Sequence, residues 1–170
     1  TNANVTLGGE APSNLGIAAL DGRLTAGGAS GRYAGLSGRI GAVPLQMADG
    51  SGDWSFAQGA LLAHGAMRVS DTQADVRFFP LRADGIALRL ADGRLTATAS
   101  LREPKGGASI ADVAIEHRLS AGTGHALLDV ADLNFGQRLQ PEAITPTTLG
   151  VVANVQGRLT GTGRIDWTPD

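Results

Sequence analysis

Apolar and polar residues alternate along several stretches of the chain with the two-residue period of a β-strand. From 86 to 90, Ile86, Leu88 and Leu90 fall on one face, while Ala87 and Arg89 fall on the other. A helix would distribute these residues around its circumference. The pattern therefore predicts a strand with one apolar and one polar face.

Three later stretches repeat this alternation, with mostly Arg, Thr, Ser, Asp or Glu at the intervening positions. Their apolar faces consist of Leu95, Ala97, Ala99 and Leu101, of Val113, Ile115, His117 and Leu119, and of Leu159, Gly161, Gly163, Ile165 and Trp167. Strands of this kind, joined by short turns, predict an all-β chain. We expect an antiparallel, hairpin-rich curved sheet that forms an open groove or a sandwich.

Turn residues punctuate this pattern. Asp-Gly pairs stand at 21–22, 49–50, 84–85 and 92–93, and each predicts a tight hairpin because both residues tolerate positive φ. The glycine-rich segment 27–38 predicts a loop with short strands. The one expected departure from β-structure is a short helix of one or two turns near 140–149, which Pro141 would begin and Thr145-Pro146 would end.

Composition narrows the function classes. The 170 residues carry a net charge of −2, which leaves no basic excess for phosphates, so nucleic acid is not an expected partner. There is no cysteine, which excludes disulfides and thiol catalysis, and no apolar run approaches the roughly 18 residues of a membrane span. We expect one β segment over 1–170, and because it starts at Thr1 without Met or a signal peptide, we expect either a processed chain or an internal fragment of a longer protein.

Candidate reactive residues do not assemble into a recognisable site. His64, His117 and His125 are isolated from the short-spaced ligands of a metal site, although His117 and His125 could meet across a hairpin. His117 is expected to pack on its apolar face. Asp71 and Asp75 make no convincing acid and base pair, and no serine stands in a Gly-x-Ser-x-Gly frame. The sequence predicts no catalytic residue, no metal and no cofactor.

A sheet with one apolar face either closes on a second layer or remains a trough that a guest fills. A lining of small and aliphatic side chains suits an acyl chain, because each exposed methylene costs about 0.8 kcal/mol and a sixteen-carbon tail therefore on the order of 12 kcal/mol. The expected lining consists of Ile86, Leu88, Leu90, Leu95, Ala97, Leu101, Val113, Ile115, Leu159, Ile165 and Trp167.

The C-terminal third carries a resemblance to a known family. Leu133-Asn134-Phe135, then Leu139-Gln140-Pro141-Glu142, and then the stretch from Val155 to Trp167 resemble the YdbH family of Gram-negative envelope proteins, relatives of the AsmA and TamB group. The resemblance implies a long periplasmic β-groove along which phospholipids move between inner and outer membranes. It also implies an inner-membrane anchor on the full-length protein, membrane proteins as partners at its ends, and no catalytic residues.

A second hypothesis comes from another class of protein. The same strands would also suit a structural β-sandwich or solenoid module of a surface protein such as an adhesin, in which the apolar faces close on each other. An apolar dye distinguishes the two, because it binds an open trough and not a sealed core. An enzyme ranks third, since it would need His117 or the segment around Asp71 and Asp75 to converge in a pocket.

Overall fold

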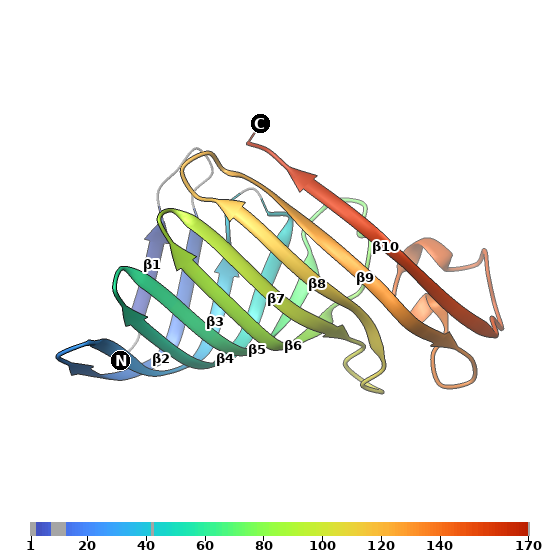
Figure 1. Ribbon diagram of the computed structural model, residues 1–170. Helices are drawn as coiled ribbons and strands as arrows, with labels where there is room; N and C mark the ends of the chain where they lie inside the picture. Colours follow the sequence, from blue (N-terminus) through green and yellow to red (C-terminus); the bar gives the residue numbers. More distant parts are fainter. Residues whose placement is uncertain (1–2, 8–12, 42, 170) are drawn as a thin grey trace.

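The computed structural model describes residues 3–7, 13–41 and 43–169, and its regular structure is a single sheet of ten strands (Figure 1). The strands are β1 (Ala3–Leu7), β2 (Ser13–Thr25), β3 (Gly28–Arg39), β4 (Leu45–Ala57), β5 (Ala60–Asp71), β6 (Leu81–Ala91), β7 (Arg94–Arg102), β8 (Ser109–Arg118), β9 (Thr123–Phe135) and β10 (Gly157–Trp167).

Each strand pairs antiparallel with its neighbours in sequence, so the sheet order is simply β1 to β10. In the described part of the chain β1 and β10 are edges with no further strand beside them, and the sheet is open. Figure 1 shows it bending, so that β7 to β10 pass in front of β1 to β5 at a steep angle. The prediction of an all-β, antiparallel, hairpin-rich sheet is confirmed.

Bulges inside the strands keep apolar residues on one face. Leu81 and Ala83 share a face with Ile86 and Leu88 only because an extra residue interrupts β6, where the pairing with β7 shifts between Asp84 and Ala87. Gly85 supplies the positive φ of +61° that this irregularity needs. A strict two-residue alternation through β6 would have placed one of these pairs in solvent.

The Asp-Gly pairs at 49–50 and 84–85 therefore do not form hairpins, and that prediction was wrong; both lie at register shifts within β4 and β6. The pair at 21–22 lies in the uninterrupted middle of β2. Only Asp92-Gly93 forms the predicted turn, between β6 and β7, with φ of +51° and +70°. Positive φ serves bulges as well as turns, so the dipeptide alone does not distinguish them.

The expectation of a loop over 27–38 was also wrong, because Gly28–Arg39 is one continuous strand. One of its glycines, Gly31, lies where a large ring crosses the sheet. Gly31 is the register partner of Trp54 on β4, and the Trp54 indole Nε1 donates a hydrogen bond to the carbonyl of Asp21 on β2, 3.2 Å away. A side chain on Gly31 would meet the backbone of Asp21.

The helix expected near 140–149 is two separate 3-10 turns, η1 (Pro141–Ala143) and η2 (Pro146–Thr148). Thr145-Pro146 ends the first turn and begins the second, because proline suits the first position of a helical turn and pushes the preceding residue to an extended conformation. In the described ranges no helix is long and apolar enough to cross a membrane.

The buried side chains form two clusters on the inner, concave face. The larger contains Val69, Leu81, Ala83, Ile86, Ile110, Ala111, Leu133 and Leu139, and the smaller contains Val43, Ala126 and Trp167. Val43 precedes β4, whereas Ala126 and Trp167 belong to β9 and β10. The smaller cluster therefore joins the loop between β3 and β4 to the opposite wall of the bent sheet.

Candidate functional site: an apolar furrow

An apolar furrow of about 170 Å³ lies between the two clusters, where the inner faces of β4 to β10 approach one another. Its lining is aliphatic or aromatic except for Thr98 and His117. The lining residues are Ile40, Val43, Leu45, Met47, Met67, Val69, Phe78, Ala83, Ile86, Leu88, Leu95, Ala97, Thr98, Ala99, Leu101, Val113, Ile115, His117, Ala126, Leu128 and Ile165.

Eight of the eleven residues expected from the sequence lie in this lining: Ile86, Leu88, Leu95, Ala97, Leu101, Val113, Ile115 and Ile165. The other three do not. Leu90 is half-buried near the β6–β7 turn, Leu159 is 49% exposed at the start of β10, and Trp167 is buried beside His117 beyond the end of the furrow.

Sequence reasoning missed the wall opposite these strands. Met47 comes from β4, where a bulge hides the alternation, Met67 and Val69 come from the uninterrupted β5, and Val43 and Phe78 come from loops. The sequence does carry one signal for this wall. Four apolar residues of β5 stand at odd-numbered positions and therefore share one face of the strand: Leu61, Ala63, Met67 and Val69. The loop residues have no periodic signal at all.

His117 and Trp167 lie at one end of the furrow. His117 is 2% exposed, and the Trp167 indole Nε1 donates a hydrogen bond to its Nδ1 over 3.1 Å. The indole lies across Gly124, the register partner of both residues, where a side chain would collide with it. Burial lowers the pKa of His117. His125 pairs with Glu116 instead, so the two histidines do not meet across the hairpin.

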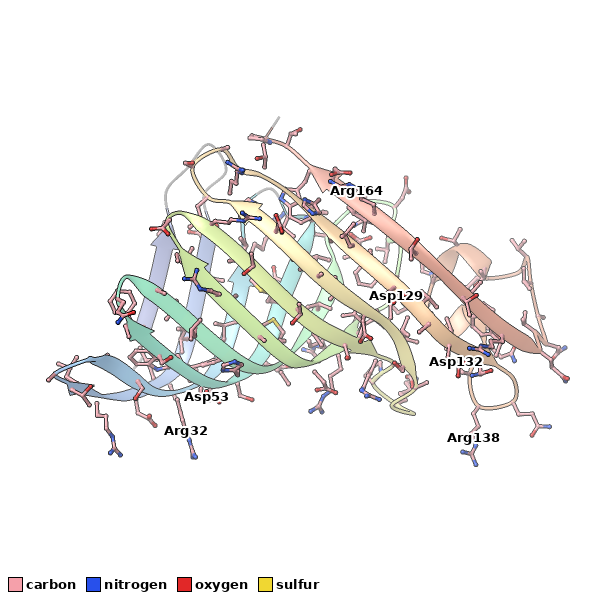
Figure 2. The ribbon with its side chains drawn as sticks, in the orientation of Figure 1. Arg32, Asp53, Asp129, Asp132, Arg138 and Arg164 are labelled. Carbon is pink, nitrogen blue, oxygen red and sulfur yellow. The ribbon has the colours of Figure 1, made fainter. Side chains whose placement is uncertain are left out.

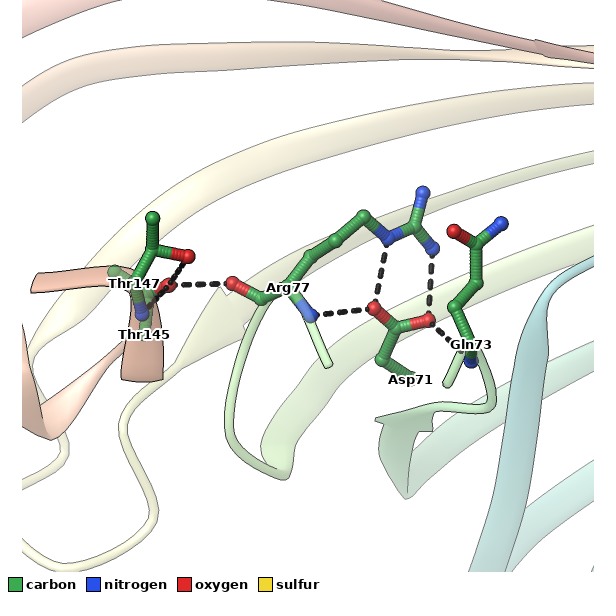
Figure 3. Close-up of polar contacts among 5 residues, drawn as sticks. All are labelled: Asp71, Gln73, Arg77, Thr145 and Thr147. Atoms are coloured by element: carbon green, nitrogen blue, oxygen red, sulfur yellow. Dashed lines mark hydrogen bonds and ion pairs between the residues drawn. The ribbon is translucent and has the colours of Figure 1, made fainter. Parts of the chain in front are cut away.

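The other end of the furrow is flanked by an ion pair between Asp71, the last residue of β5, and Arg77 (Figure 3). The fully buried Asp71 carboxylate accepts hydrogen bonds from Arg77 Nε at 2.7 Å, from Arg77 Nη2 at 2.9 Å, and from the backbone N–H groups of Arg77 and Gln73. These bonds lower the pKa of Asp71 to about 2. Asp71 therefore has a structural partner and is not paired with Asp75.

The outer face of the sheet is polar and charged. Figure 2 shows labelled side chains such as Arg164, Asp129 and Asp132 projecting from β9 and β10 away from the inner face. Exposed ion pairs join neighbouring strands, among them Arg158 to Asp132 at 2.8 Å. Such pairs contribute little to stability but keep the face hydrated. One exception is Leu127, which is 44% exposed on this face next to the furrow residue Leu128.

The arrangement offers a guest extensive apolar contact and very few hydrogen-bonding groups. Such a lining suits a hydrocarbon chain and provides no means to orient a polar substrate. Within residues 3–7, 13–41 and 43–169, there is no group of three or more His, Cys, Asp or Glu side chains that could hold a metal ion.

Comparison with known proteins agrees with this geometry. The model of the YdbH-like family, described as intermembrane phospholipid transport protein YdbH, matches residues 1–170. No curated protein and no solved structure gave a significant match to the chain.

Proposed function

The chain belongs to the YdbH-like family of intermembrane phospholipid transport proteins, and we propose that its furrow holds the acyl chains of phospholipids during that transport. The family consists of transport proteins and not of enzymes, and its work places it in the cell envelope between two membranes. The observation that carries the proposal is the continuous apolar lining contributed by seven successive strands.

The furrow lowers the cost of moving a hydrocarbon chain through water. Each methylene that leaves the membrane unprotected costs about 0.8 kcal/mol, and the inner face replaces water with side chains such as Leu95, Val113 and Ile115. Few directional contacts hold the guest in one place. A lining of this kind therefore allows a chain to slide along it.

Leu90, Leu159 and Trp167 are assigned to the same face by register, although they lie outside the furrow itself. We assign them to the continuation of the apolar surface toward the ends of the sheet. Leu159 pairs with buried Leu133, and it is half-exposed at the β10 edge, where a guest would leave or arrive.

In this proposal the chain is one β segment, residues 1–170, of a longer periplasmic bridge whose full-length parent is anchored in the inner membrane. Inner- and outer-membrane proteins are its partners at the two ends. The support is the intermembrane transport that gives the family its description. The segment contributes a stretch of conduit and does not bridge the two membranes by itself.

The test uses neighbouring residues on opposite faces of β9. Leu128→Gln places an amide in the furrow lining, whereas Leu127→Gln makes the same change on the outer face. The chain is expressed in the periplasm of a Gram-negative host, purified without detergent, and examined by native mass spectrometry and lipid extraction. We expect bound phospholipid in the wild type and in Leu127→Gln, and at least a threefold loss in Leu128→Gln.

A second variant separates loss of binding from loss of folding. Ala97→Leu fills the furrow without introducing a polar group, and Ala114→Leu makes the matched change on the outer face of β8. Circular dichroism checks that each variant keeps its β-structure. Phospholipid absent from the wild type, together with no binding of an apolar dye, would instead favour the structural module with a sealed interior.

A further inference from the structure

Two loops that are far apart in the sequence meet at the end of the furrow marked by Asp71. One is the β5–β6 loop, residues 72–80, and the other is the segment 139–149 between β9 and β10, which contains η1 and η2. The Phe79 N–H donates to the Ile144 carbonyl over 2.7 Å, and the Thr145 hydroxyl donates to the Arg77 carbonyl over 2.6 Å. We call these two joined segments the strap.

The underside of the strap is apolar and belongs to the core. Phe78 lines the furrow, while Leu139 is buried in the larger cluster and Ile144 packs against it. The first segment follows β5 and the second follows β9, so the strap joins strands that are four places apart in the sheet. It therefore covers the concave face at this end.

The joint between the two segments has fewer hydrogen bonds than the anchor of the β5–β6 loop. The β5–β6 loop is held by four hydrogen bonds to the buried Asp71 carboxylate, as Figure 3 shows. The second segment is held by its own turns, in which Thr145 also accepts from the N–H of Thr147. Two hydrogen bonds cross the joint, one to the Ile144 carbonyl and one to the Arg77 carbonyl, and these two described segments form no β-ladder with each other.

The cover at the opposite end differs in kind. There the β3–β4 loop inserts Val43 into the cluster of Ala126 and Trp167, and burial of apolar surface holds it in place. At the end of the second segment and just after it, by contrast, apolar side chains face solvent: Leu149 is 57% exposed and Val151 is 78% exposed. These exposed side chains offer a hydrocarbon chain apolar contact outside the furrow.

We infer that the strap is the releasable gate through which an acyl chain enters or leaves the furrow, an inference that rests on the function proposed above. Asp71 and Arg77 are positioning residues that hold the β5–β6 loop rigid. Thr145 is the positioning residue that latches the second segment onto it. Opening breaks the two hydrogen bonds across the joint and separates Ile144 from the apolar cluster that Phe78 also contacts, while the four hydrogen bonds to Asp71 stay in place.

The first experiment measures how fast a phospholipid with one fluorescent acyl chain dissociates from the purified 170-residue chain into acceptor vesicles of phosphatidylethanolamine and phosphatidylglycerol. Thr145→Val removes the latch hydroxyl and keeps the side-chain shape. Thr148→Val is the control, because the Thr148 hydroxyl donates only within its own turn, to the Thr145 carbonyl. We expect dissociation at least threefold faster for Thr145→Val, within 1.5-fold of wild type for Thr148→Val, and restored by Thr145→Ser.

The second experiment locks the gate. The chain has no cysteine, so Gln73→Cys and Thr147→Cys, at exposed positions on the two halves of the strap, can be joined by a bismaleimide whose spacer is long enough to span the Asp71–Arg77 pair that lies between them in Figure 3. We expect the joined protein to release the probe at least threefold more slowly than the same double variant before joining. This arm needs no substitution in the latch.

The outcomes separate the two proposals. A wild-type chain that binds no probe overturns both the proposed function and the gate. Binding that is normal, with dissociation rates unchanged by Thr145→Val and by joining the strap, overturns the gate alone. Equal acceleration by Thr145→Val and Thr148→Val also overturns it, because the effect then belongs to the turn and not to the latch.

Discussion

The inner face of the sheet is covered over the furrow and bare at the tips of the β2–β3 and β4–β5 hairpins. Leu95, on the covered part, is 6% exposed, whereas Leu24 near the β2–β3 tip is 88% exposed and Phe56 near the β4–β5 tip is 47% exposed. All three lie on the same face by strand register. Strand alternation assigns a side chain to a face, but it does not bury it.

What differs between the two regions is the presence of loops that cross the concave face. The β3–β4 loop and the strap bring Val43, Phe78 and Ile144 onto strands of the opposite wall. No such segment reaches Leu24 in the described part of the chain. The bare region also uses glycine in place of large side chains, with rings such as Tyr33 and Trp54 lying across the gaps.

The largest expected effect contrasts a buried with a bare leucine. Leu133→Ala should lower the free energy of unfolding by about 2–5 kcal/mol, because it leaves a cavity in the larger cluster. Leu24→Ala should change it by less than about 0.5 kcal/mol. Urea unfolding followed by circular dichroism measures both. Equal costs would mean that the two regions are equally covered.

The next largest expected effect concerns Asp71, which anchors the strap. Its contribution to the free energy of unfolding depends on pH. The Asp71 pKa is about 2 in the folded chain and 3.8 ordinarily, so the unfolded state binds a proton more readily. The resulting stabilisation, roughly 2 kcal/mol, is fully present above the ordinary pKa and is lost as pH falls through the folded value. Asp71→Asn should therefore cost about this much in urea unfolding at neutral pH and almost nothing near pH 2. A cost that stays the same at both pH values would contradict the ion pair.

An effect of similar size tests the glycines of the bare region. A side chain on Gly52 would collide with the carbonyl of His64, to which the Tyr33 hydroxyl also donates a hydrogen bond over 3.3 Å. Gly52→Ala should cost about 1–3 kcal/mol, because the strands must move apart. Gly27→Ala, in an open turn with nothing nearby, is the control and should cost less than about 0.5 kcal/mol. Thermal unfolding compares the two variants.

The smallest expected effect concerns the other end of the furrow. Trp167→Phe removes the donor to His117 Nδ1 and should cost about 1 kcal/mol. Burial lowers the pKa of His117, so the unfolded state protonates first and the folded chain loses stability as pH falls below the ordinary value of 6.5. In Trp167→Phe the pKa of His117 should rise, because the variant lacks the indole N–H that donates a hydrogen bond to the neutral imidazole. Proton NMR titration of His117 measures this, and an unchanged pKa would show that the indole hydrogen bond has no effect on the titration.

Much of the candidate site could be predicted from alternation alone. In β7, β8 and the second half of β10 the apolar residues follow an unbroken two-residue period, and Leu95, Ile115 and Ile165 lie in the furrow as a result. The opposite wall could not be found in this way. Bulges in β4 and β6 reverse the alternation, and they depend on positive φ at residues such as Asp49 and Gly85, which read in the sequence as turns.

The sequence by itself determined that the chain is a sheet of antiparallel strands with one apolar face, because side-chain period and turn residues act between neighbours along the chain. Only the tertiary structure decided which part of that face is covered. Contacts such as Val43 with Trp167, or Thr145 with Arg77, join residues more than sixty positions apart, and no local pattern specifies them. They form only once the bent sheet has brought its two walls together.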